Sequence, residues 1–289
     1  MRRRRLFKRF LFYTSSCFII AMMLSLLMLL ASLSTYREGA LAHDALTELA
    51  VTTPSPQRRI PQAAHPLIIS LEEPEPKIAP EPEPEEELPL RETFTLPYHI
   101  TLPEIDFDAL REINPHVVAW VLLEGTPINY PVVHYRDNHR YLNHLFDGRR
   151  NQAGTIFVDA YNQPGFVDRH TIFYGHNMRN GSMFAAIERY RSQAFFDENP
   201  WLFILTPSGN YAVELFAGYT TNVYGPSWRL DFGDDEDFLS WVYESRRRSD
   251  FISGVEVSPW DHLVTFSTCA YAFSNARYVL VGRMLPIAD

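Results

Sequence analysis

The apolar run His262-Leu-Val-Thr-Phe-Ser-Thr ends in Cys269, and its part 262–267 has the pattern of a β-strand. Other short runs in the chain share its character, because they are rich in branched or aromatic side chains and are bounded by Gly, Pro or Asn. Many short strands with few helices between them predict a mainly β fold, in the form of a mixed or closed β-barrel. The other predicted strands are 117–123, 131–134, 154–159, 171–174, 201–206, 211–219 and 278–284.

A few helices are expected between these strands. At 104–114 apolar residues recur on one face, and Pro115 ends the segment. The segment 234–251 begins with acidic residues and carries arginines at 246–248, which matches its charges to the helix dipole. Two shorter helices are predicted at 141–146 and 182–190.

The N-terminal residues have the composition of a membrane anchor. Residues 1–9 carry six Lys or Arg side chains, whereas residues 10–36 carry no charge and consist mostly of Leu, Ile, Met, Phe and Ala. That stretch is long enough to cross the hydrocarbon core as one helix of about 20 residues. Because Lys and Arg stay inside, 1–9 is predicted to be a cytoplasmic tail, with the chain after 10–36 outside the cell. The alternative is a signal peptide cleaved after Ala40-Leu41-Ala42.

Residues 37–92 are predicted to form an extracellular linker. Ten prolines lie between 52 and 92, and glutamates alternate with them in the last third. This composition favours an extended polyproline II stalk, and a disordered spacer is the alternative. A length of 289 residues suggests about two domains, but the linker leaves a single domain, at 93–289. The net charge of −9 and the absence of basic runs in that domain exclude a nucleic-acid partner.

The exported domain contains a single cysteine, Cys269, because the other cysteine of the chain, Cys17, lies in the apolar stretch. An unpaired thiol is open to oxidation outside the cell, so its presence needs a reason. One interpretation is an inert core cysteine. The other is a nucleophile at the end of a strand, with Arg277 as the nearby cation that favours the thiolate.

A histidine could carry the proton for such a thiol. His176 follows the strand-like run 171–174 in a turn after Gly175, which makes it the best candidate among the eight histidines of the domain. His170 and His262 flank strands and are predicted to lie at the surface.

These motifs resemble those of a known family. Tyr174-Gly-His-Asn-Met178, Thr265-Phe-Ser-Thr-Cys269 and Arg277 together are similar to the class B sortases, membrane-anchored cysteine transpeptidases of Gram-positive bacteria. The likeness covers about residues 100–285 and includes the order of the motifs along the chain. Two further stretches are similar to that class, Asn129-Tyr-Pro-Val-Val133 and Gly154-Thr-Ile-Phe-Val-Asp159.

The resemblance implies an eight-stranded sortase-type β-barrel that needs neither a metal nor a bound cofactor. Cys269 would attack the carbonyl after a threonine in an Asn-Pro-x-Thr-like sorting motif of an exported protein and form a thioester. Arg277 would hold the substrate carbonyl. His176 would protonate the leaving amine and then accept a proton from an amine of the peptidoglycan cross-bridge or of lipid II. The residues implied to contact the peptide are Asn143, Thr220, Tyr224, Ser267 and Thr268.

Two other functions stay open at this point. A papain-like extracellular cysteine peptidase generally places its cysteine before its histidine, at a helix N-terminus, whereas here His176 precedes Cys269. An anchored adhesin or binding module with an inert thiol would keep its function after Cys269→Ala.

Overall fold

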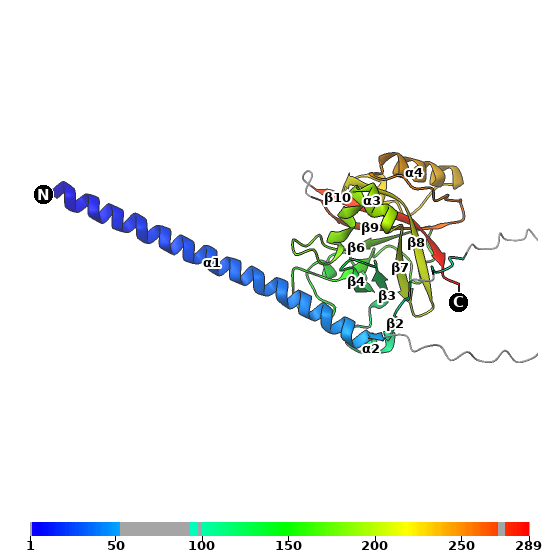
Figure 1. Ribbon diagram of the computed structural model, residues 1–289, viewed down its shortest axis with the longest axis horizontal. Coiled ribbons are helices and arrows are strands. Elements are labelled where there is room, and N and C mark those ends of the chain that lie inside the picture. The colour runs from blue at the N-terminus through cyan, green and yellow to red at the C-terminus, as the bar shows by residue number, and fades with distance from the viewer. Residues whose placement is uncertain (1, 53–92, 98–99, 271–274, 289) are drawn as a thin grey trace, which may run out of the picture.

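The computed structural model describes residues 2–52, 93–97, 100–270 and 275–288 (Figure 1). Its centre is a closed barrel with the strand order β10-β8-β7-β3-β4-β5-β6-β9, so the predicted eight-stranded barrel is confirmed. Neighbouring strands are antiparallel except for the parallel pairs β4–β5 and β6–β9. The strands are β3 (Val117–Leu122), β4 (Asn129–His134), β5 (Ile156–Val158), β6 (His170–Tyr174), β7 (Trp201–Thr206), β8 (Gly209–Asn222), β9 (His262–Cys269) and β10 (Ala276–Pro286).

Short helices connect and cover the strands. They are α2 (Phe107–Ile113), α3 (Gln193–Glu198), α4 (Asp235–Arg248), and the 3-10 helices η1 (Arg140–Leu142), η2 (Phe184–Arg191) and η3 (Pro226–Trp228). The Asp234 carboxylate caps α4 by accepting from the backbone N–H of Asp237 at 2.8 Å. The predicted helix at 104–114 begins later, because Asp106 caps α2 and Glu104–Ile105 is a strand, β2.

Along each strand of the barrel, successive side chains point alternately into the barrel and outward. The inward side chains form one interior cluster, and the outward ones form two clusters that helices cover. On β9, Val264 and Phe266 belong to the interior cluster, whereas Leu263 packs with α4 on the outside. The helix α4 supplies Phe238, Trp241 and Val242 to this outer cluster, together with Tyr219, Val279 and Val281 of β8 and β10. A second outer cluster lies between β3, β4 and β7 and the N-terminal helices α1 and α2.

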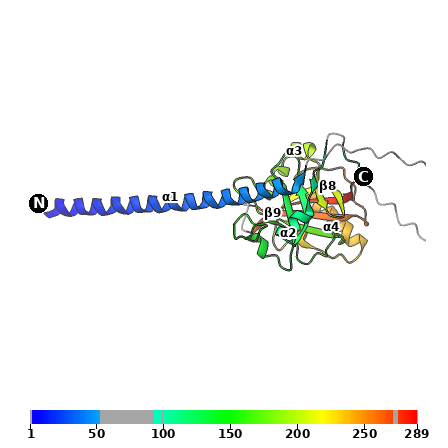
Figure 2. The same cartoon turned by 90° about the horizontal axis from the view of Figure 1, so that it is seen from below.

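The helix α1 (Arg2–Ala50) is longer than the sequence analysis predicts. Its part from Ser16 is apolar and long enough to cross a membrane, and Figures 1 and 2 show it projecting from the barrel with only its C-terminal end against the other elements. The sequence predicts a linker from residue 37, but the helix continues to Ala50. Leu46 and Ala50 are buried in the second outer cluster, one helical turn apart. This spacing gives residues 37–50 an apolar face that the barrel covers.

After α1 the chain stays on the barrel. The strand β1 (Val51–Thr52) pairs with β2, with Val51 opposite Ile105. The Pro- and Glu-rich segment 53–92 lies outside the described residues, and on its far side Phe94 already bridges to Ile287 after β10. The two ends of this segment are therefore both held by the same domain.

His170, predicted to lie at the surface, is fully buried, so that prediction is wrong. Its Nδ1 lies 2.5 Å from the carbonyl oxygen of Arg229 and its Nε2 lies 2.7 Å from Oγ1 of Thr265. The carbonyl can only accept, so Nδ1 carries the hydrogen and the Thr265 hydroxyl donates to Nε2. Both partners are distant in the sequence, and the neutral ring satisfies both.

We expect His170 to make the fold acid-sensitive. Burial lowers its pKa from 6.5 to about 4, against the smaller opposing effects of the Arg229 carbonyl and of Asp159. Between those values the unfolded chain binds a proton that the native chain does not, so stability is complete above pH 6.5 and falls as the pH drops toward 4. The free energy of unfolding should fall by about 3 kcal/mol more in wild type than in His170→Gln between pH 7 and 4. Chemical denaturation at several pH values measures this, and equal pH profiles for the two proteins would contradict it.

A second prediction concerns Gly154. Its φ is +63°, and a Cβ there would collide with the backbone oxygen of Tyr141 and lie 3.0 Å from that of Leu142. Gly154→Ala should therefore cost about 3 kcal/mol or more in the free energy of unfolding. Gly125 is the matched control, because its φ is +69° but nothing lies within 4 Å of the added Cβ. Gly125→Ala should cost only about 1 kcal/mol, and similar losses for both variants would refute the steric explanation.

Candidate active site

The pairing of the last two strands sets the position of Cys269. Cys269 ends β9 directly opposite Arg277 of β10, and Arg277 lies opposite Thr221 of β8. Opposite residues of antiparallel strands share a face, with Cβ atoms about 5 Å apart. Thr221, Arg277 and Cys269 thus form one row across three strands. Two residues further along, Ser267, Val279 and Tyr219 form the next row of that face. Val279 and Tyr219 belong to the outer cluster under α4. The row of Thr221, Arg277 and Cys269 therefore lies on the outer side of the barrel, beyond the part that α4 covers.

The strand β6 brings His176 to the same end of β9. These two strands are parallel, with Tyr174 beside Ser267, and the N–H of Gly175 donates to the Ser267 carbonyl at 3.1 Å. Just after His176, the amide Nδ2 of Asn177 donates to the Cys269 carbonyl at 2.8 Å. The structure therefore holds the backbone around His176 against the backbone of Cys269.

The imidazole of His176 is oriented by a backbone carbonyl. Its Nε2 lies 2.7 Å from the oxygen of Leu142, the last residue of η1. A carbonyl oxygen cannot donate, so Nε2 must carry a hydrogen. With Nε2 engaged in this way, Nδ1 is the ring nitrogen through which His176 can act as a base or an acid.

An aromatic and acidic group lies beside Arg277. The hydroxyl of Tyr174 donates to Asp159 at 2.8 Å, and Asn138 donates to the same carboxylate oxygen at 3.1 Å. Burial raises the pKa of Tyr174, Asp159 raises it further, and the charge of Arg277 partly offsets both. The guanidinium charge is thus close enough to Tyr174 to influence it, and Trp228 lies near the same ring at 6.1 Å between centroids.

The five residues predicted to bind substrate differ in exposure and in the face of the barrel on which they lie. Asn143 is exposed next to Leu142, and Tyr224 is 87% exposed in the segment after β8. Ser267 shares the face of Cys269, and its hydroxyl is buried without a hydrogen-bond partner among the described residues. Thr220 and Thr268 instead lie in one row with Tyr278, whose ring belongs to the interior cluster. The structure does not bring these two threonines to the Cys269 face.

Sequence reasoning missed three contributors to this site. Thr221 stands in the Cys269 row where the sequence analysis expects Thr220, a difference of one residue in strand register. Leu142 acts through its carbonyl, which no side-chain motif reveals. Asn177 enters the sequence analysis only as part of a motif, although its amide bridges Cys269 and, at 2.9 Å, Glu188. Among the described residues no group of three His, Cys, Asp or Glu side chains could hold a metal ion.

No family model matches the chain, but two characterised proteins are similar to it in sequence. Sortase B of Staphylococcus aureus (strain NCTC 8325 / PS 47) is 33% identical over 184 residues, which cover 63% of this chain and 75% of that protein. Sortase B of Listeria monocytogenes serovar 1/2a is 34% identical over 178 residues, 61% of this chain and 72% of that protein.

Solved structures that resemble this chain are also structures of sortase B. A Staphylococcus aureus sortase B–substrate complex is 33% identical with a TM-score of 0.60 and covers 63% of this chain and 85% of that one. Clostridium perfringens sortase B is 33% identical with a TM-score of 0.59, over 62% of this chain and all of that one (100%). The barrel and its inserted helices are thus shared with these proteins.

The geometry of His176 predicts its tautomer. Neutral His176 should be the Nε2–H form because of the Leu142 carbonyl, whereas His262 should be the Nδ1–H form, since its Nδ1 lies 2.9 Å from the carbonyl of Asp168. Long-range ¹H–¹⁵N correlation spectra of ¹⁵N-histidine-labelled protein at high pH distinguish the two forms, and His176→Gln and His262→Gln assign the signals. A neutral His176 protonated on Nδ1 would contradict this arrangement.

Proposed function

The chain belongs to the class B sortases, and we propose that Cys269, His176 and Arg277 perform the cysteine transpeptidase reaction of this family. The enzyme class and the barrel follow from the relatives. The roles of the three residues are our assignment. The observation that carries the assignment is the pairing of Cys269 with Arg277 across β9 and β10, with the His176 backbone tied to the same strand end.

In the first half-reaction, the thiolate of Cys269 attacks the carbonyl carbon of the threonine in the sorting motif. The guanidinium of Arg277 donates hydrogen bonds to the carbonyl oxygen as negative charge develops on it. The C–N bond then breaks, and imidazolium His176 gives its Nδ1 proton to the leaving amine. A thioester joins the substrate to Cys269, and neutral His176 keeps the hydrogen on Nε2 that the Leu142 carbonyl accepts.

In the second half-reaction, an acceptor amine attacks the thioester carbon. Neutral His176 takes a proton from this amine, which makes it a competent nucleophile and restores the imidazolium. The C–S bond breaks, the thiolate of Cys269 leaves, and the new amide is released. Neither step consumes anything besides the two substrates, so the pair Cys269–His176 returns to its starting state.

The donor substrate is an exported protein with an Asn-Pro-x-Thr-like sorting motif, and the acceptor is an amine of peptidoglycan or lipid II. One solved sortase B structure is described as a complex with triglycine, which supports an amine acceptor of that kind. For contacts to the donor peptide, Ser267 and Thr221 share the face of Cys269, whereas Asn143 and Tyr224 are supported by their exposure to solvent. Thr220 and Thr268 stay predictions whose place in the fold gives them no support.

For the whole chain we propose a cytoplasmic tail at 1–9, a membrane span at 10–36 and a catalytic domain that includes 93–289. The apolar helix is consistent with a single-pass anchor. The basic residues before it support an N-terminus inside the cell and a catalytic domain outside. Since residues 37–52 pack on the barrel, they belong with the catalytic domain, and the linker shortens to 53–92.

The two alternative functions, a papain-like peptidase and an adhesin, fit the fold and the relatives less well. A papain-like peptidase does not fit a closed barrel with the cysteine at the end of a strand. An adhesin with an inert thiol does not account for relatives that are named sortase B.

Substitution of the proposed catalytic residues tests the assignment. The full-length protein in detergent is incubated with an Asn-Pro-x-Thr peptide and triglycine, and transfer is followed by mass spectrometry. Cys269→Ala should form no product. Arg277→Ala should lower kcat by about 100- to 1,000-fold, and Arg277→Lys should retain part of the rate.

Arg247→Lys is the matched control, because Arg247 lies exposed on α4 and pairs with Glu244 of the same helix. It should leave transfer unchanged. The assignment fails if Arg277→Ala transfers as fast as wild type, or if wild type forms neither thioester nor exchange product with any such peptide.

A further inference from the structure

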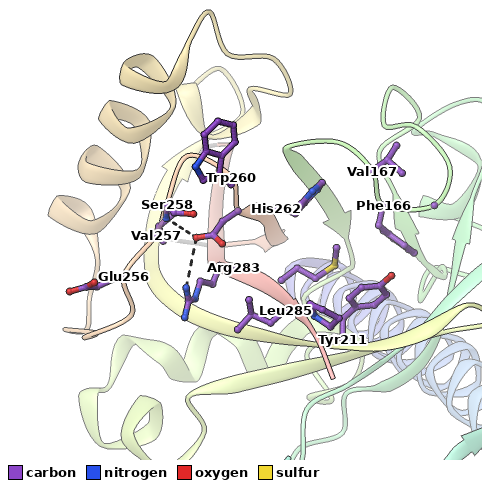
Figure 3. A pocket seen from close by; sticks show the side chains of 14 residues that line it. Phe166, Val167, Tyr211, Glu256, Val257, Ser258, Trp260, His262, Arg283 and Leu285 are labelled. Carbon is purple, nitrogen blue, oxygen red and sulfur yellow. Dashed lines mark hydrogen bonds and ion pairs between the residues drawn. The ribbon is translucent and has the colours of Figure 1, made fainter. Parts of the chain in front are cut away.

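A second cleft opens at the far end of the strands that carry the catalytic residues (Figure 3). It has a volume of about 650 Å³ and is lined by the start of β9 at His262, the end of β10 at 283–286 and Tyr211 of β8. Two loops, 165–167 and 256–261, form its walls. His262 and Cys269 are separated by seven steps along β9, or about 23 Å at the rise of a strand. The cleft is therefore separate from the proposed active site.

One wall exposes an aromatic face that the fold does not cover. Trp260 is 70% exposed at the rim of the cleft, in the loop that precedes β9. On the facing wall, Phe166 has a φ of +59°, a conformation that costs a bulky residue about 1–3 kcal/mol. Its ring stacks on Phe173 with centroids 5.8 Å apart, and this contact holds the loop in place. The loop 165–167 is thus held in place, while the indole of Trp260 on the other wall is left to solvent.

The floor of the cleft is charged and ordered. The side chains of Arg283 and Asp261 are only 16% and 15% exposed, and Arg283 Nη1 lies 3.8 Å from Asp261 Oδ2. Arg283 Nε donates to Glu214 at 2.8 Å, and Asp261 Oδ2 accepts from the backbone N–H of Ser258 at 2.7 Å. A carboxylate and a guanidinium are therefore held with fixed orientation at the bottom of the cleft, below an exposed indole.

We propose that this cleft binds a glycan. The flat face of Trp260 suits the apolar face of a pyranose ring, because both are rigid and bury area at little entropic cost. Sugar hydroxyls both donate and accept hydrogen bonds, so they suit a carboxylate and a guanidinium that lie side by side, as Asp261 and Arg283 do.

Other ligand classes fit less well. The lining carboxylates, Glu256 and Asp261, outnumber the single guanidinium of Arg283, which disfavours an anion. A closed barrel offers no free strand edge to which an extended peptide could add. A charged floor also disfavours an acyl chain, which would leave Asp261 and Arg283 desolvated.

The identity of the glycan rests on the proposed function. If the acceptor amine belongs to peptidoglycan, the sugar strand that carries it is the glycan nearest to the enzyme during transfer. A strand held in the cleft would lie about 23 Å from Cys269, taken along β9 from His262, and a peptide of about seven extended residues spans that length. The cleft would then raise the local concentration of the acceptor amine at the thioester.

Binding is tested with the full-length Cys269→Ala protein, in a zwitterionic detergent that carries no sugar. The probe is the β-1,4-linked tetrasaccharide of N-acetylglucosamine, titrated by calorimetry. Trp260→Ala and Asp261→Asn should each weaken binding by about tenfold or more. Tyr243→Ala is the control, because Tyr243 is an aromatic residue of α4 that is 65% exposed outside the cleft, and it should bind like the parent protein.

Transfer assays separate this proposal from the proposed function. With active protein, Trp260→Ala should raise KM about tenfold for an acceptor peptide attached to the sugar strand and leave transfer to triglycine unchanged. Absence of tetrasaccharide binding, equal binding by Trp260→Ala, or Trp260-dependent binding of the sugar-free acceptor peptide would overturn the glycan site. Failure of the proposed function would appear instead as no transfer to triglycine, and the tetrasaccharide titration does not depend on that outcome.

Discussion

The hydrogen-bonded register of β9 is the constraint on which the rest of the site depends. On one side β9 pairs antiparallel with β10, which closes the barrel and sets Cys269 opposite Arg277. On the other side it pairs in parallel with β6, which brings the chain that follows Tyr174 to the same strand end. A slip of one residue in either pairing would turn Cys269 to the other face of the sheet. Backbone pairing thus sets Cys269 opposite Arg277 and brings the chain that carries His176 beside them.

The sequence is sufficient to find these three residues but not their surroundings. Cys269 and His176 follow strand-like runs directly, so local patterns locate both. Burial of His170 depends on Thr265 and Arg229, which lie 95 and 59 residues away, and no local pattern reports such partners. Choosing Thr221 over Thr220 requires the register of β8 against β10, which includes a bulge at Val281/Gly282. Local pattern therefore gives the proposed nucleophile, Cys269, whereas the residues around it depend on pairing between segments that are distant in the sequence.

Local sequence patterns are also insufficient at the N-terminal end of the chain. The long uncharged stretch marks an anchor, and the Pro- and Glu-rich composition after it suggests a stalk between the anchor and the domain. The helix α1, however, continues through that point to Ala50, and its last turns pack on the barrel. A stalk between anchor and domain needs its two ends on different bodies, whereas Thr52 pairs with Glu104 of β2 and Phe94 bridges to Ile287, just after β10. The described residues on either side of 53–92 therefore both belong to the same folded unit.

The outer face of β8, β9 and β10 changes chemistry along its length, and this change shows where α4 can cover it. Leu263, Val279 and Val281 are apolar and pack against Phe238 and Trp241 of α4. Toward the other end of the same face stand Ser267, Cys269, Arg277 and Thr221, which offer α4 no apolar surface to bury. A helix gains stability only over the apolar part, so it leaves the polar end open to a substrate. The change from apolar to polar side chains along this face thus explains both why α4 covers one end and why the other end, with Cys269, stays uncovered.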